Sequence, residues 1–165
     1  MFGARRHDVV DPPAPLFVFR RIEVRAALVI PRPRAVVWEA FDAQAVDDHG
    51  GSGHFDIVGA PEAGLGAKSL RIGPPMPLGL RVIMHTEVIA EEPGFWRTTQ
   101  MIGGIAEQTE TLMLADVEDG RTRATVNSLM SRMMPSDQDL EPARVVLHGL
   151  AMTWLERISR FAEEA

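Results

Sequence analysis

Hydrophobic and polar residues alternate with a period of two along much of the chain. In the clearest run, apolar or small residues occupy every second position from Ile22 to Ile30 and alternate with Arg21, Glu23 and Arg25. Such alternation is typical of a β-strand with one buried face. Six further segments of strand character follow, separated by turns rich in Gly and Pro: His54–Val58, Ala67–Ile72, Leu80–Ala90, Phe95–Ile102, Glu107–Val117 and Arg123–Arg132. Their short connections predict an antiparallel meander.

The spacing of apolar residues becomes helical between the first strand and the meander. Pro31 and Pro33 end the strand, and apolar residues at helical spacing follow over Ala35–Ala45. The polar, Gly-rich segment Asp47–Gly53 then interrupts the pattern. We therefore predict two short helices after the first strand.

A much longer helical pattern occupies the end of the chain. It predicts a helix from about Gln138 to Ala162, capped by Ser136 or Asp137. Seven apolar residues fill one arc of its helical wheel: Leu147, Leu150, Ala151, Trp154, Leu155, Ile158 and Phe161. A helix of this kind cannot bury its apolar stripe alone, and a curved sheet needs a cover on its concave face.

These elements predict an α+β fold in which a curved, seven-stranded antiparallel sheet surrounds the long C-terminal helix. A chain of 165 residues can form one such domain. Residues 1–15 are predicted to be a flexible tail, because their prolines at 12, 13 and 15 favour neither a helix nor a sheet ladder. The single domain therefore spans residues 16–165.

Several motifs in this order resemble the START/SRPBCC superfamily, also called helix-grip proteins, which includes polyketide cyclases and lipid-transfer domains. The segment Val29–Asp42 is similar to the family's first strand, Ile-x-x-Pro turn and Val-Trp-containing helix. Leu65-Gly66-Ala67, the segment from Val88 to Pro93, and Gly120–Thr125 are similar to later turns of the family. The chain departs from the family at Ala45–Gly51, where an aromatic-rich segment is usual.

The resemblance implies a cavity between the concave face of the sheet and the long helix. Strand alternation, read from the sequence, assigns Gln108 and Glu110 to the lined face, together with Thr98 and Gln100 of the preceding strand. A shift of one residue would exchange each set for its neighbours. The candidate ligand-binding residues are Met84, Thr98, Gln100, Gln108, Leu112, Val126, Ser128, Met130, Met134, His148 and Ala151.

The mouth of this cavity is predicted at one end of the meander, where alternate loops meet. These loops are Gly73–Gly79, Gly103–Ile105 and Ser131–Asp139. Five methionines gather at that end: Met76, Met101, Met130, Met133 and Met134. Flexible thioethers suit a mouth that adapts to an apolar guest, although methionines that simply fill gaps in a core would give the same pattern.

Glu110 is the candidate catalytic residue. A carboxyl that faces the cavity would have its pKa raised by burial and could act as a general acid or base. The alternative is a solvent-facing carboxylate at the rim of the sheet. His148, at the edge of the apolar arc, could bind a ligand carbonyl, but a boundary histidine with its tip in water is also consistent with the pattern. His85 is predicted to face outward.

Composition excludes several other classes of function. The net charge of −6 argues against a nucleic-acid binder held by phosphate contacts, and the absence of Cys excludes a thiolate nucleophile or a zinc–thiolate site. A His-x-x-x-x-His spacing at His49 and His54, near Asp42, Asp47 and Asp48, resembles that of Rieske oxygenases, but its Gly-rich interior favours a polar turn with no metal. No cofactor is predicted. No apolar segment is long enough to span a membrane, and the first residues have no apolar region after a basic start, which argues against a secretory signal, so we expect a cytoplasmic protein.

The predicted function is binding of a small, largely hydrophobic metabolite, such as a lipid, polyketide, quinone or terpenoid. The alternative is an enzyme that resembles polyketide cyclases and aromatases and uses Glu110 as its acid or base. A weaker alternative is a protein-interaction domain, and a homodimer is possible. The fold alone does not decide among these functions.

Overall fold

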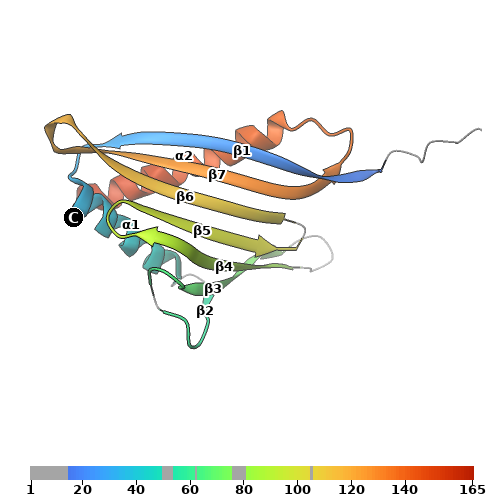
Figure 1. Cartoon of the computed structure of the whole chain (residues 1–165), viewed down its shortest axis with the longest axis horizontal. Helices are drawn as coiled ribbons and strands as arrows, with labels where there is room; N and C mark the ends of the chain where they lie inside the picture. The colour runs from blue at the N-terminus through green and yellow to red at the C-terminus, as the bar shows by residue number, and fades with distance from the viewer. Residues whose placement is uncertain (1–14, 50–53, 62, 76–80, 105) are drawn as a thin grey trace, which may run out of the picture.

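The computed structural model describes residues 15–49, 54–61, 63–75, 81–104 and 106–165, with the backbone alone for 44–49, 54–56, 71, 73–75 and 81–82. It confirms an α+β fold with one antiparallel sheet and a long C-terminal helix (Figure 1). The sheet contains, in spatial order, β1 (Phe17–Ile30), β7 (Arg121–Pro135), β6 (Ala106–Val117), β5 (Trp96–Gly103), β4 (Arg81–Glu92), β3 (Lys68–Pro75) and β2 (His54–Asp56). All neighbouring strands are antiparallel.

The register between strands defines an inner face of the sheet, turned toward the C-terminal helix α2 (Glu141–Glu164). Val126 of β7 lies opposite both Ala26 of β1 and Leu112 of β6, and all three are buried. Directly opposite residues of an antiparallel pair share a face of the sheet. The predicted alternation of β1, β6 and β7 is therefore the one that the fold adopts.

Helix α2 packs mainly over β1 and β7 and begins later than the sequence predicted. The Asp139 carboxylate accepts a hydrogen bond from the Glu141 N–H at 3.0 Å, and Pro142 occupies the first turn, where its missing N–H costs nothing. The predicted caps Ser136 and Asp137 thus precede the helix. The core beneath α2 combines both helices and three strands: Ala26, Ile30, Val37, Ala40, Phe41, Leu112, Leu114, Ala124, Val126, Ala151, Leu155, Ile158 and Ala162.

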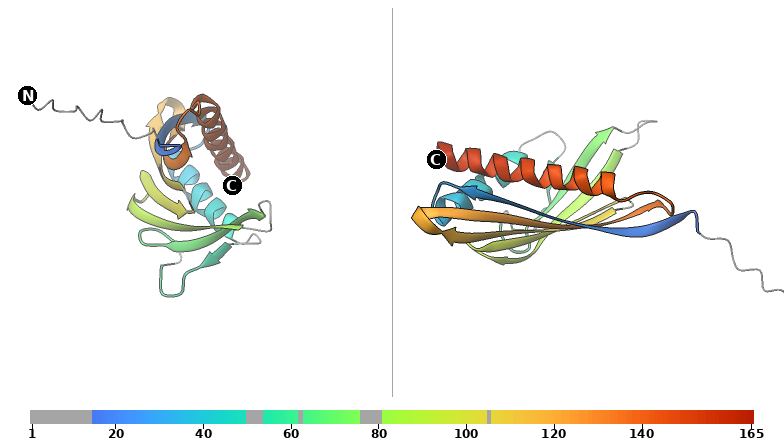
Figure 2. Two further views of the ribbon diagram at one scale, coloured as in Figure 1. Left: turned by 90° about the vertical axis from the view of Figure 1, so that its right-hand side faces the viewer. Right: turned by 90° about the horizontal axis from the view of Figure 1, so that it is seen from above.

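One continuous helix, α1 (Arg34–His49), replaces the two short helices predicted after the first strand. It runs through the predicted break at Asp47 and Asp48 because its buried residues near Phe41 already anchor it against α2 and the sheet. Tertiary packing outweighs the weak helix preference of Asp in the last turn. Figure 2 shows α1 on the inner side of the sheet, between α2 and the strands.

Arg32, in the turn between β1 and α1, fixes the C-terminal end of α2. Its Nε donates to the Ala162 carbonyl at 3.0 Å and its Nη2 donates to the Glu163 carbonyl at 3.1 Å. These are carbonyls at the negative end of the helix dipole, which a cation stabilises. The buried Thr122 hydroxyl donates to the Arg32 carbonyl at 2.8 Å. The turn, β7 and α2 are thereby held in one arrangement.

Trp154 is partly buried, and its ring meets that of Phe41 in α1 edge to face, with centroids 5.7 Å apart. Because the ring keeps part of its surface in water, we expect Trp154→Ala to lower the free energy of unfolding by about 1–2 kcal/mol. The fully buried Leu155 is the matched comparison, and Leu155→Ala should cost about 2–5 kcal/mol. Urea melts of the two variants test this order. A larger loss for Trp154→Ala would contradict it.

Candidate functional site

A hydrogen-bonded polar cluster lies on the inner face of β6 and β7. Gln108 Nε2 donates to Glu110 Oε1 at 2.7 Å and to Ser128 Oγ at 2.9 Å. Ser128 lies directly opposite Glu110 in the register, and it is buried, whereas Gln108 and Glu110 are half-buried. The alternation of both strands places the cluster on the face that carries the core. We call these three residues the Gln108 cluster.

Strand β5 presents the opposite set of residues from the one that was predicted. Thr99 lies opposite Glu110, and Met101 lies opposite Gln108, so these two residues share the inner face with the cluster. The predicted ligand-binding residues Thr98 and Gln100 lie on the outer face. There, the Thr98 hydroxyl bonds to that of Thr111 at 3.0 Å and Gln100 Nε2 donates to Glu107 Oε1 at 2.7 Å.

Strand β4 continues the inner face beyond β5. Thr86 lies opposite Met101, and Met84, two residues earlier on the same face, packs over Gly103, where a Cβ would lie 2.7 Å from the Met84 Cγ. Among the described residues, the Thr86 hydroxyl has no hydrogen-bond partner although its oxygen is buried. Met84, Thr86, Thr99 and Met101 are all half-buried, in contrast to the fully buried residues under α2. The inner face of β4–β6 is therefore only partly covered.

Solved structures with a similar fold exist, although comparison of the sequence alone finds no relative. No protein-family model matches the sequence, and no curated protein matches it. The structure is similar to the crystal structure of Ara h 8.0201, with a TM-score of 0.66 and 12% identity over 88% of this chain and 100% of that chain. It is also similar to norcoclaurine synthase from Thalictrum flavum in complex with dopamine and hydroxybenzaldehyde, with a TM-score of 0.64 and 10% identity over 90% and 89% of the two chains.

A third similar structure is DynU16, a protein of the dynemicin biosynthetic locus. The TM-score is 0.55 at 22% identity, over 86% of this chain and 47% of that chain. These similarities show that the chain has the helix-grip fold. At these identities the likeness concerns the fold.

Within the helix-grip fold, four predicted ligand-binding residues belong to closed core instead of a cavity wall. Leu112, Val126 and Ala151 are buried in the cluster beneath α2, and Met134 is buried in a second cluster with Ile22, Val24 and Leu147. Helix α2 lies close enough over β1 and β7 to fill this space with its own side chains. The space that was predicted to form the apolar inner end of the cavity is thus filled by side chains of the protein itself.

The predicted gathering of methionines at the mouth is correct only in part. Met101 is half-buried on the inner face, and Met130, opposite Gln108, packs against the second core cluster. Met133 lies on the outer face, opposite Phe19 of β1, and is exposed. Met76 and Ile105 lie outside the described residues, as does most of the Gly73–Gly79 loop.

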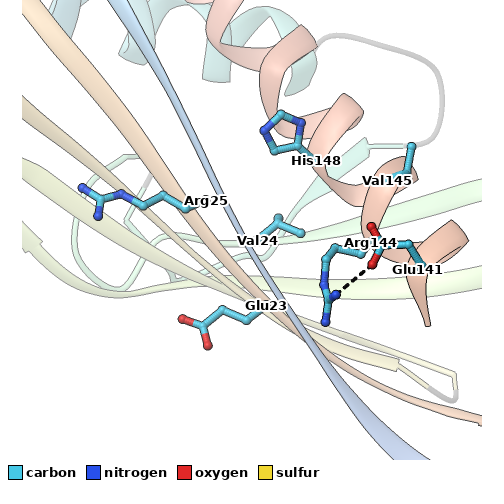
Figure 3. A pocket seen from close by; sticks show the side chains of 7 residues that line it. All are labelled: Glu23, Val24, Arg25, Glu141, Arg144, Val145 and His148. Atoms are coloured by element: carbon cyan, nitrogen blue, oxygen red, sulfur yellow. Dashed lines mark hydrogen bonds and ion pairs between the residues drawn. The ribbon is translucent and has the colours of Figure 1, made fainter.

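His148 is exposed and lines a different site from the Gln108 cluster. It contributes to a pocket of about 390 Å³ between β1 and the first turns of α2 (Figure 3). The pocket is lined by Glu23, Val24, Arg25, Glu141, Arg144, Val145 and His148. Its charged residues include the ion pair between Arg144 Nη1 and Glu141 Oε2 at 2.9 Å. The predicted alternative, a boundary histidine with its tip in water, fits this position.

A buried arginine is the feature of the inner face that the sequence did not reveal. Arg97 of β5 keeps only 7% of its side chain exposed. It forms ion pairs with Glu91 of β4 and with Asp42 of α1, the latter at 2.8 Å from Nη1 to Oδ1. Its guanidinium also stacks near the rings of Trp38 and Phe41, 5.0 and 4.6 Å from their centroids. We call these five residues the Arg97 cluster.

A β-bulge brings Glu91 into the Arg97 cluster. The register between β4 and β5 shifts between Val88 and Ala90. Without that shift, strict alternation from Val88 would turn Glu91 to the outer face. With it, Glu91 lies opposite Arg97, on the inner face. The bulge is therefore what permits β5 to turn an arginine inward.

Of the five residues around the His-x-x-x-x-His spacing, the structure describes the side chain of Asp42 alone. The Asp42 carboxylate is engaged by Arg97. The side chains of Asp47, Asp48, His49 and His54 lie outside the described residues, and no group of three potential metal ligands occurs among the remainder. No helix in the described part of the chain has the length and apolar character needed to cross a bilayer.

Proposed function

We propose that the chain binds a small, largely hydrophobic molecule on the inner face of β4–β6, with its polar end at the Gln108 cluster. The observation that carries this proposal is the contrast across one face of the sheet. Under α2 the face is closed core, whereas over β4–β6 it carries half-buried methionines, a hydrogen-bonded polar cluster and the buried Thr86 hydroxyl without a partner among the described residues. A buried polar atom without a partner is costly, and a ligand can supply the partner.

Helix α2 offers an apolar wall above this face. Val146 and Leu150 precede Trp154 by two turns and one turn, so these three residues share a flank of the helix. Trp154 contacts α1, which lies on the inner side of the sheet, so the same flank is directed over the uncovered strands. Leu150 is 62% exposed although sequence analysis placed it in the buried arc. An apolar guest would cover Val146 and Leu150 on one side and Met84 and Met101 on the other.

The comparisons support a small organic guest without identifying it. In the similar norcoclaurine synthase, the fold holds dopamine and hydroxybenzaldehyde, which are small aromatic molecules with polar groups. Lipids, quinones, polyketides and terpenoids combine an apolar body and an oxygenated end in a comparable way. The Gln108 amide and the Ser128 hydroxyl suit such an end, and the methionines adapt to a variable body.

The direct experiment is to expose the purified protein to a cell extract and to identify the bound molecule by native mass spectrometry. The proposal expects a discrete adduct that is soluble in organic solvent, has a mass of a few hundred daltons and is lost on denaturation. A protein that emerges without any adduct from extracts of several sources would contradict it.

The second candidate function is an enzyme of the cyclase class, because a carboxyl on the inner face, accepting from Gln108 at 2.7 Å, is placed where an acid or base could reach a guest.

Glu110→Gln separates the two functions. Glutamine keeps the shape of the side chain and removes its acid–base chemistry. A carrier should therefore retain its ligand nearly as well as the native protein, whereas a cyclase that depends on this carboxyl should lose turnover by roughly a hundredfold or more. Ligand occupancy by mass spectrometry and product formation, measured on the same preparation, distinguish these outcomes. Unchanged turnover would remove Glu110 from the mechanism.

A further inference from the structure

The N-terminal part of β1 is an exposed apolar strand edge. In the described sheet, β1 pairs with β7 alone, so its other edge has no partner strand. Leu16 is exposed, and Phe17 and Phe19 keep 59% and 68% of their surface in water. Phe17 and Phe19 point to the outer face, where Met133 of β7, also exposed, lies opposite Phe19. Exposed aromatic residues beside an unpaired edge are typical of a surface that another strand covers.

Helix α2 protects the rest of this edge but not its beginning. The second core cluster ties α2 to β1 at Ile22 and Val24 through Leu147. The N-terminal end of β1 extends beyond the first turn of the helix, as the view from above shows (Figure 2, right). Proteins commonly guard an edge strand with a helix, charges or proline. Within β1, residues 17–19 carry none of these guards.

We propose that a second copy of this chain pairs antiparallel with this segment of β1, around a two-fold axis at Val18. In that register Phe17 lies opposite Phe19 of the second copy, and Phe19 lies opposite Phe17, so the four rings meet on the outer face beside Met133. Aromatic cross-strand pairs are among the favourable pairs of an antiparallel sheet.

The pairing of the aromatic rings favours this register over its neighbours. A centre moved to Phe19 would set Phe17 against Arg21, and a centre moved to Arg20 would set it against Glu23. Each would separate Phe17 from Phe19 of the second copy and so remove the reciprocal aromatic pairs. The isologous contact is closed, because the same residues on both copies are used, so it yields a dimer and not a fibre. Because the contact is short, it is a reversible dimer with a Kd on the order of micromolar.

The dimer is tested by light scattering coupled to gel filtration, from about 1 µM to about 500 µM protein. The native chain should shift from monomer to dimer mass across this range. Phe19→Lys should remain monomeric. Ile83→Lys is the matched control, because Ile83 is a strand residue with 59% exposure on the outer face of β4, and it should dimerise like the native chain. A native chain that stays monomeric throughout, or equal effects of the two variants, would overturn the proposal.

The absence of cysteine permits a test of the register itself. In the proposed pairing Val18 lies opposite Val18 of the second copy, at a Cα separation of about 4.5–5.5 Å, which a disulfide spans. Val18→Cys should therefore form a disulfide-linked dimer on mild oxidation, whereas Val24→Cys, beneath α2, should not. Crosslinking through position 24 instead of 18 would show that the edge pairs differently and would refute this interface. The interface does not depend on the proposed ligand site.

Discussion

Replacing Arg97 by methionine should lower the free energy of unfolding by about 3–5 kcal/mol. Methionine keeps much of the apolar stem of arginine but removes the charge. Glu91, whose side chain is 8% exposed, would then be a buried carboxylate without its counter-ion. The stacking of the guanidinium on Trp38 and Phe41 would be lost as well. The ion pair with Asp42 adds less, because that carboxylate is 40% exposed and is screened by water.

A double variant isolates the orphaned charge as the cause. Arg97→Met combined with Glu91→Leu removes both ions from the interior, and its stability should lie within about 1–2 kcal/mol of the native chain. Arg121→Met is the surface control, since Arg121 and its partner Asp119 are 46% and 85% exposed, and it should cost less than about 1 kcal/mol. Urea denaturation of the four proteins provides the measurement. A double variant that is less stable than Arg97→Met alone would refute this explanation.

The Arg97 cluster also explains which part of the fold could be predicted from the sequence. The strands β1, β6 and β7 alternate cleanly, and their inner residues beneath α2 are hydrophobic, so the alternation gives the correct face. On β5 hydropathy gives the wrong face. Trp96 and Ile102 are more hydrophobic than Arg97, yet they lie outside, because the charge of Arg97 is compensated by two carboxylates, Glu91 across the turn and Asp42 in α1. The indole N–H of Trp96 has a hydrogen-bond partner on the outer face, because Nε1 donates to Glu92 Oε2 at 3.1 Å.

The wrong choice of the inner face of β5 also led to wrong candidate residues for the ligand site. Thr98 and Gln100 were assigned to the cavity because they share a face with Trp96, whereas the residues that join the Gln108 cluster are Thr99 and Met101. The signal that could have corrected this assignment was Glu91 six residues before Arg97, an acid–base pair across a tight turn. Its use requires knowledge of the bulge at Ile89, and no residue there marks a bulge in the sequence.

The extent of the core could not be predicted from the sequence for a different reason. A stripe such as Leu147, Ala151 and Leu155 shows that a helix packs on a sheet, but it does not show over which strands the helix lies. Because α2 lies over β1 and β7, Leu112 and Val126 are buried in the core and do not line a cavity. The proposed ligand site lies instead on the inner face of β4–β6. The position of a helix across a sheet depends on contacts such as those between Arg32 and the last turn of α2, which involve residues 130 positions apart.

Two adjacent threonines on opposite faces of β5 test the location of the site. Thr99 lies on the inner face opposite Glu110, and Thr98 lies on the outer face opposite Thr111. Thr99→Trp would fill the space above the Gln108 cluster with an indole ring. Binding of a small apolar guest should weaken by about a thousandfold, because the guest and the new side chain compete for the same volume. Thr98→Trp adds the same ring to the outer face and should leave binding within about threefold of the native value.

The fluorescent apolar probe 1-anilinonaphthalene-8-sulfonate serves for this measurement, followed by the natural guest once it is identified. Circular dichroism of both variants verifies that the fold is kept, which is expected since both threonines are only half-buried. Equal binding by the two variants would contradict a site on the inner face. Weaker binding by Thr98→Trp than by Thr99→Trp would place the site on the outer face, where Thr98 and Gln100 lie. The proposed site requires the opposite order, since the Gln108 cluster, Met84 and Met101 all share the face of Thr99.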